Sequence, residues 1–121
     1  MHVLYLTSDL MFSSRATGVI HSFGGSIEVI SSAAELVRCA TTQHVQLVIL
    51  DLSLPGFEPE ATVVALRNLA QPPDAIVAYA PHVHKQKLVA ATSAGCDEVL
   101  SQGAFDRELH RIVRSYENGS A

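Results

Sequence analysis

One acidic side chain stands at the end of the most apolar segment of the chain. Residues 45–50, Val-Gln-Leu-Val-Ile-Leu, lead directly to Asp51, and the turn signal Pro55-Gly56 follows. Such a run between turn signals is typical of a strand covered on both faces of a parallel sheet. A carboxylate at the carboxyl end of that strand lies where open α/β sheets bind ligands, and it can serve as a nucleophile or a metal ligand. The alternative is that Asp51 only begins the turn, where aspartate is common.

The length and composition suit a single domain. The chain has 121 residues, of which 48% are hydrophobic and 17% are charged. A chain of this size can bury a hydrophobic core without a disulfide or a structural metal. We expect one domain over residues 1–117 and a frayed tail over residues 118–121.

The charge and the sequence disfavour several classes of protein. The formal net charge of −4 argues against nucleic-acid binding, which needs a clustered positive field. No apolar run is long enough to span a bilayer, and the first residues do not read as a signal peptide. Cys39 and Cys96 lack metal-ligand spacing. We therefore expect reduced thiols in a cytoplasmic protein that binds neither nucleic acid nor membrane.

Strand patterns and helix patterns alternate along the chain. Strands are predicted at residues 2–6, 26–30, 45–50, 75–79 and 98–100. Helices are predicted at residues 10–23, 32–41, from 59 to before 71, 84–93 and 104–116, with Met11, Val64 and Val89 among the residues facing inward. Strict alternation implies a parallel sheet with helices on both faces. The predicted fold is α/β, a flavodoxin-like (βα)5 doubly wound three-layer sandwich with a parallel five-stranded sheet in the order 2-1-3-4-5.

This order places the turn after the first strand beside Asp51. The switch point of such a sheet lies between the first and third strands, so Thr7-Ser8-Asp9 and Asp51 should converge there. Ser8 or Asp9 can also cap the first helix by accepting hydrogen bonds from its free backbone N–H groups.

Three segments resemble the receiver domains of two-component response regulators. They are Thr7-Ser8-Asp9, the run from Asp51 to Gly56, and Ala94-Gly95-Cys96-Asp97-Glu98-Val99-Leu100. The resemblance covers nearly the full length of the chain. It implies that Asp51 is equivalent to the aspartate that accepts a phosphoryl group from a histidine kinase, and that the chain is a signalling protein rather than an enzyme.

The resemblance also implies a Mg²⁺ site, whose ligands are only partly present. In the family, two acidic residues follow the first strand and help to hold the ion. Thr7 and Ser8 stand at these positions, and only Asp9, one place later, is acidic. Asp9 and Asp51 are weak candidates for metal ligands if the alignment shifts by one residue. We otherwise expect no metal and no cofactor, and Mg²⁺ only if the chain accepts phosphoryl groups.

Further departures surround Asp51. Ala80 stands where the family has a Ser or Thr that hydrogen-bonds the phosphoryl group, and Gln102 stands where it has a lysine. Glutamine can donate a hydrogen bond but carries no charge. Val99 replaces the aromatic switch residue of the fifth strand. Ser53, two residues after Asp51, is the remaining residue expected at the edge of the site.

The leading hypothesis is a degenerate receiver, or pseudo-receiver, that works through protein–protein interaction while phosphorylation at Asp51 is absent or inefficient. The partner would be a histidine kinase, an output protein or a second copy in a homodimer. The expected surface is helix 84–93, strand 98–100 and helix 104–116, the face that most receivers use. The first alternative is a working Mg²⁺-dependent response regulator phosphorylated on Asp51. The second is a flavodoxin-like enzyme or small-ligand-binding protein.

Overall fold

The computed structural model describes residues 1–117, and the tail that was predicted to fray lies outside them. The strands are β1 (His2–Leu6), β2 (Ser26–Ile30), β3 (Leu47–Asp51), β4 (Ala75–Ala80) and β5 (Glu98–Ser101). The helices are α1 (Leu10–Ser22), α2 (Ala33–Thr42), α3 (Pro59–Arg67), α4 (Lys85–Ala94), α5 (Gln102–Arg107) and α6 (Leu109–Tyr116). Within the described residues, no helix combines the length and the apolar character needed to cross a membrane.

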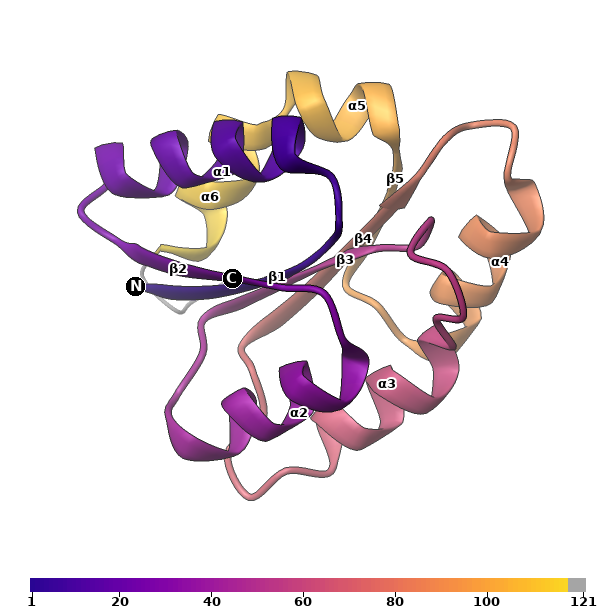
Figure 1. Ribbon diagram of the computed structural model, residues 1–121, viewed down its shortest axis with the longest axis horizontal. Coiled ribbons are helices and arrows are strands. Elements are labelled where there is room, and N and C mark those ends of the chain that lie inside the picture. The colour runs from indigo at the N-terminus through magenta and orange to yellow at the C-terminus, as the bar shows by residue number, and fades with distance from the viewer. Residues whose placement is uncertain (118–121) are drawn as a thin grey trace.

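The strands form one parallel sheet in the order β2-β1-β3-β4-β5, which confirms the predicted flavodoxin-like fold. Helices α1, α5 and α6 cover one face, and α2, α3 and α4 cover the other (Figure 1). β3 and β4 are buried at every position, as expected for inner strands covered on both faces. Because the strands are parallel, the carboxyl end of β3 lies at the same edge of the sheet as the carboxyl ends of the neighbouring strands.

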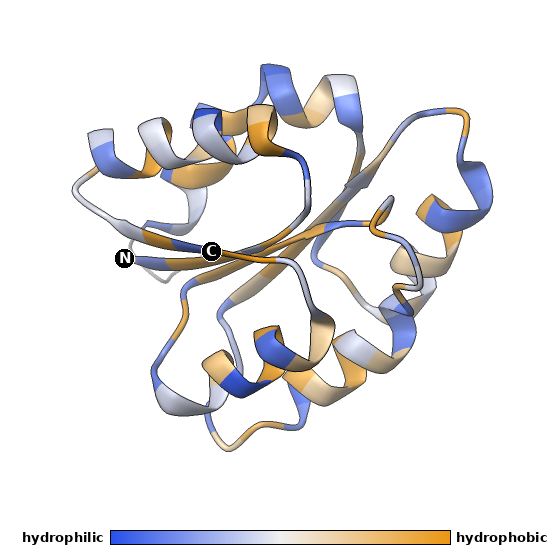
Figure 2. Ribbon diagram, in the orientation of Figure 1, coloured by the Kyte–Doolittle hydropathy of each residue, from blue (hydrophilic) through white to orange (hydrophobic). Residues whose placement is uncertain are grey.

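Alternate residues of each strand face two separate cores because successive strand side chains point to opposite faces. The core under α2, α3 and α4 is aliphatic, whereas the core under α1, α5 and α6 contains Tyr5, Tyr79 and Phe105. Figure 2 shows hydrophobic stretches along the strands of the sheet, and helices that carry both hydrophobic and hydrophilic residues. Asp51 lies two residues after Ile49 on β3, so its side chain points to the same face of the sheet, the face covered by α1, α5 and α6.

Local signals begin and end several helices as predicted. Asp9 caps α1, and Ser32 caps α2 by accepting from the Glu35 N–H. The Glu35 side chain pairs with Arg38, so no hydrogen bond completes the predicted capping box. Gly95 ends α4 in the left-handed conformation, with φ of 102°.

The predicted last helix, residues 104–116, is wrong as a single element. It begins at Gln102, because the Ser101 hydroxyl caps it by accepting from the Ala104 N–H, and it divides into α5 and α6. The backbone at Glu108, with φ of −103° and ψ of 12°, leaves the helical region and separates the two. The apolar spacing did not reveal this break, because residues on both sides of it face the same core.

Three residues predicted to face inward are exposed. Met11 is 80% exposed, Val64 is 50% exposed and Val89 is 65% exposed. In α1 the buried face instead includes the small residues Ser13 and Ala16. A count of large apolar residues overlooks such small residues and adds exposed ones, although Val19 and Ile20 of α1 and Val63 and Leu66 of α3 are buried as predicted.

Candidate functional site

β1 and β3 bring Thr7 and Asp51 to the same edge of the sheet. The two strands pair in parallel with Leu6 opposite Leu50, so the next residues, Thr7 and Asp51, lie side by side at the carboxyl edge of the sheet. The Thr7 hydroxyl donates a hydrogen bond to Oδ2 of Asp51 at 2.7 Å. Thr7 is 2% exposed and Asp51 is 7% exposed, so water is largely excluded from this bond.

The second carboxylate oxygen of Asp51 is bound by the turn that follows β3. The backbone N–H of Ser53 donates to Oδ1 of Asp51 at 2.9 Å, and the N–H of Leu54 donates to the Asp51 carbonyl at 3.2 Å. This is the local arrangement by which aspartate starts a turn. Gly56 continues that turn with φ of 72°, a value that favours glycine. Both oxygens of Asp51 thus accept hydrogen bonds from groups within the chain. Asp51 begins the turn after β3, as the alternative interpretation of this residue expected.

Asp9 acts as the cap of α1 and is joined to the site through Thr7. The Asp9 N–H donates to Oγ1 of Thr7 at 3.0 Å. Oδ1 of Asp9 accepts from the N–H groups of Met11 and Phe12, both at 3.0 Å. Of the two roles considered for Asp9, the geometry shows the helix cap.

Tyr79 and Tyr5 lie beside Asp51 and were not predicted as site residues. Tyr79 is opposite Asp51 in the register of β3 and β4, and its hydroxyl lies 2.5 Å from that of Tyr5. Burial, and after it the charge of Asp51, raises the pKa of Tyr79. Burial and the neighbouring Tyr79 raise the pKa of Tyr5. The sequence did contain a signal for this: in the alternation of side chains along the strands, Tyr5 and Tyr79 face the same side of the sheet as Asp51.

The other predicted site residues lie near the same edge but make no bond to Asp51. Ala80 is fully buried at the end of β4, and Ser8 is exposed. Gln102 is the first residue of α5, and none of the hydrogen bonds among residues 1–117 joins it to Asp51. In the same range, no Lys or Arg forms an ion pair with Asp51. The carboxylate is therefore held by neutral donors only.

Comparison with known proteins gives matches among solved structures only. No family model matches the sequence, and no curated protein matches it significantly. The signal receiver domain of a response regulator from Bermanella marisrubri superposes with a TM-score of 0.83, covering 97% of this chain and 98% of that chain at 20% identity. The chain has the receiver fold.

Two further neighbours show the same fold. The receiver domain of the sensor histidine kinase PA1611 from Pseudomonas aeruginosa has a TM-score of 0.81 at 17% identity, with 97% of each chain covered, and holds a magnesium ion in its active-site cleft. The beryllofluoride-activated receiver domain dimer of NtrC4 has a TM-score of 0.78 at 17% identity, with 98% of each chain covered.

The residues at the Asp51 edge do not fit a Mg²⁺ ion. Magnesium needs hard oxygen ligands with free lone pairs in a near-octahedral arrangement. Here Thr7 directs its proton at Oδ2 of Asp51, and Oδ1 of Asp9 already accepts two backbone N–H groups. Ser8 adds no charge. The receiver fold is therefore present with Asp9, the other acidic residue of this turn, serving as a helix cap.

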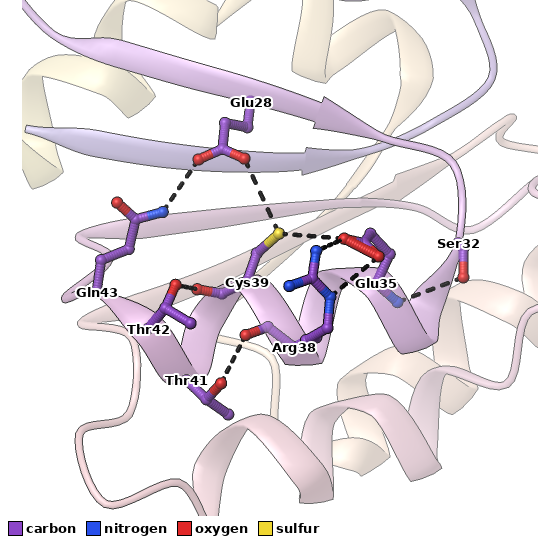
Figure 3. Close-up of polar contacts among 8 residues, drawn as sticks. All are labelled: Glu28, Ser32, Glu35, Arg38, Cys39, Thr41, Thr42 and Gln43. Carbon is purple, nitrogen blue, oxygen red and sulfur yellow. Dashed lines mark hydrogen bonds and ion pairs between the residues drawn. The ribbon is translucent and has the colours of Figure 1, made fainter.

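A separate polar cluster surrounds Cys39 on β2 and α2 (Figure 3). Its sulfur lies 3.7 Å from Oε2 of Glu35 and 3.9 Å from Oε2 of Glu28, and Glu28 also accepts from Gln43. Burial and these carboxylates raise the pKa of the Cys39 thiol, which makes it a poor nucleophile. Across the described part of the chain, no group of three His, Cys, Asp or Glu side chains could hold a metal ion.

Proposed function

We propose that this chain is a receiver-like module of two-component-type signal transduction that acts by binding a protein, with phosphorylation at Asp51 absent or inefficient. The observation that carries the proposal is the state of Asp51, whose two oxygens accept from Thr7 and Ser53. Phosphoryl transfer to a carboxylate needs a cation to neutralise the reacting oxygens. A site with neutral donors and one carboxylate supplies little of that stabilisation, so the module is a binding protein and not an enzyme.

The test is incubation with acetyl phosphate and Mg²⁺, followed by intact-mass measurement. We expect no stable mass increase of one phosphoryl group in the wild-type protein. An increase that disappears in Asp51→Ala would overturn the proposal and establish the alternative, a Mg²⁺-dependent phosphoacceptor. An increase that persists in Asp51→Ala would report modification elsewhere and would leave Asp51 unphosphorylated.

The proposed partner surface is formed by α4, β5 and the helices α5 and α6. A groove of about 270 Å³ lies between α4 and β5 and is lined by Leu88, Val89, Thr92, Ser93, Val99, Leu100 and Ser101. None of these side chains is charged. Glu98, which precedes the lining residue Val99 on β5, is already bound by Arg111 and by the Tyr116 hydroxyl. This surface therefore offers apolar contact area to a histidine kinase, an output protein or a second copy of the chain.

Substitutions on α4 test this surface. Val89 is 65% exposed, so Val89→Glu should leave the fold intact while placing a charge in the groove. Ala90→Glu is the matched control, because Ala90 is also exposed but does not line the groove. In sedimentation equilibrium, we expect self-association that Val89→Glu abolishes and Ala90→Glu preserves. A wild-type protein that stays monomeric at high concentration would remove the homodimer and leave the other partners.

The small-ligand alternative gains no support from the hollows of the surface. Besides the groove between α4 and β5, hollows lie between the ends of α2 and α3 and at the start of α4. Thr7, Asp51 and Ala80 line none of these three. At the edge where a flavodoxin-like enzyme would hold its ligand, Thr7, Asp51 and Ala80 are buried.

A further inference from the structure

The hydroxyl of Thr7 makes two hydrogen bonds within the chain. It has one proton, which it donates to Oδ2 of Asp51, and it accepts from the N–H of Asp9. A cation that approached Oδ2 would have to displace that proton, and Asp9, the other acidic residue of this turn, already uses Oδ1 to cap α1. The hydrogen bond therefore occupies the place on Asp51 where a metal would bind.

The same hydroxyl connects three elements of the fold. Thr7 follows β1, Asp51 ends β3, and Asp9 caps α1 through the N–H of Phe12. The ring of Phe12 lies 6.1 Å from the ring of Tyr79, which is opposite Asp51 in the sheet. Thr7 therefore links β1, β3 and α1, and the contact of Phe12 with Tyr79 joins α1 to the strand next to Asp51.

We infer that Thr7 is the positioning residue that takes the place of a divalent cation at Asp51, so that this edge keeps one arrangement with or without Mg²⁺. The inference deepens the proposed function, because it names the residue that separates Asp51 from metal chemistry. The carboxylate then stabilises the β1–α1 turn, and its charge is balanced by hydrogen bonds from Thr7 and Ser53.

The experiment compares the wild type with a double variant, Thr7→Asp/Ser8→Asp, during titration with MgCl₂. The wild-type melting temperature and the amide resonances of Asp9 and Ser53 should not respond to Mg²⁺. The double variant should melt below the wild type without the ion, because like charges crowd a buried edge. Its melting temperature should rise saturably with Mg²⁺, since an ion that binds only the folded state stabilises it.

Two controls identify the source of any response. The matched variant Thr7→Asn/Ser8→Asn changes the same positions without charge and should show no saturable Mg²⁺ response. Adding Asp51→Asn to the acidic variant should abolish the response, because the ion would lose the carboxylate it shares. A response that survives Asp51→Asn would place the ion elsewhere and overturn the inference.

A saturable Mg²⁺ response of the wild type would overturn the inference even if the protein accepts no phosphoryl group, so its failure and that of the proposed function are distinguishable. If the acidic variant does not fold, Thr7→Val decides. It should lower the melting temperature and shift the Asp9 and Ser53 amide resonances, because the bond that places Asp51 is lost. Unchanged resonances in Thr7→Val would show that Thr7 does not position the carboxylate.

Discussion

The hydroxyls of Tyr5 and Tyr79 lie 2.5 Å apart in the core between the sheet and helices α1, α5 and α6. Tyr79 also stacks on Phe105 of α5, with ring centroids 4.3 Å apart and an interplanar angle of 14°. Among the hydrogen bonds of the described residues, the only side-chain partner of each of these hydroxyls is the other one. The two phenols therefore depend on one shared bond.

This shared bond predicts coupled effects of removing the two hydroxyls. Tyr79→Phe leaves the buried Tyr5 hydroxyl without a partner, and we expect it to cost about 1–3 kcal/mol of unfolding free energy. Tyr5→Phe should cost a similar amount, because it leaves the buried Tyr79 hydroxyl without a partner. The double variant should be closer in stability to either single variant than to the sum of the two losses. Urea denaturation of the four proteins measures this coupling, and additive losses would contradict the shared bond.

Asp97 joins the start of β4 to the segment before β5. Its Oδ2 accepts from the Ile76 N–H at 2.7 Å and from Nη2 of Arg67 at 2.8 Å. We expect Asp97→Ala to lower the unfolding free energy by about 1–2 kcal/mol, because the Ile76 N–H loses its acceptor. Arg67→Ala removes a partly exposed ion pair and an exposed hydrogen bond to the Gly95 carbonyl, and should cost less than about 1 kcal/mol. Equal losses in urea denaturation would show that the ion pair, and not the backbone contact, stabilises this corner.

The sheet order could be predicted from the sequence because it depends on patterns that few folds share. The continuous apolar run of β3 and the strict alternation of elements leave little choice of topology. The division at Glu108 could not be predicted, since the apolar residues of α5 and α6 face one core. The exposed face of α4 at Val89 was missed for a related reason, because tertiary packing and not apolar spacing decides which arc of a helix is covered.

The meeting of Thr7 and Asp51 followed from topology, but the bonds they make did not. Strand order alone brings the residues after β1 and β3 to one edge. Which carboxylate oxygen Thr7 contacts, and the choice of Asp9 as a cap, depend on side-chain rotamers that the sequence does not reveal. Tyr79 was overlooked because an aromatic residue in a strand normally signals core packing, and its pairing with Asp51 depends on register.

The raised pKa of the Cys96 thiol should make both its reactivity and the stability of the fold depend on pH. Burial raises its pKa from 9.0 to about 11. Below pH 9 the thiol is protonated in both states, so its contribution to stability is complete there and is lost as the pH rises from about 9 to about 11. At pH 8 the thiolate fraction of the native protein should be about 100-fold lower than that of the unfolded protein.

Reaction with a chromogenic disulfide between pH 7 and pH 10, in a Cys39→Ser background, measures this difference on Cys96 alone. The native rate should keep rising with pH above 9, where the rate of the urea-unfolded protein levels off. Equal native and unfolded rates at pH 8 would show that the burial of Cys96 does not hold its proton.

The capping hydrogen bonds of Asp9 can be distinguished from its negative charge by substitutions that keep or remove a helix cap. Asp9→Ala removes the acceptor for the Met11 and Phe12 N–H groups and should cost about 1 kcal/mol, with faster amide exchange at both residues. Asp9→Asn and Asp9→Ser retain a side-chain oxygen that caps almost as well, so both should remain near the wild type. Urea denaturation and hydrogen exchange at constant pH compare the four proteins. If Asp9→Asn lost as much stability as Asp9→Ala, the negative charge rather than the cap would be what α1 requires, and the N-terminal dipole of the helix would then be the main reason for an acid at this position.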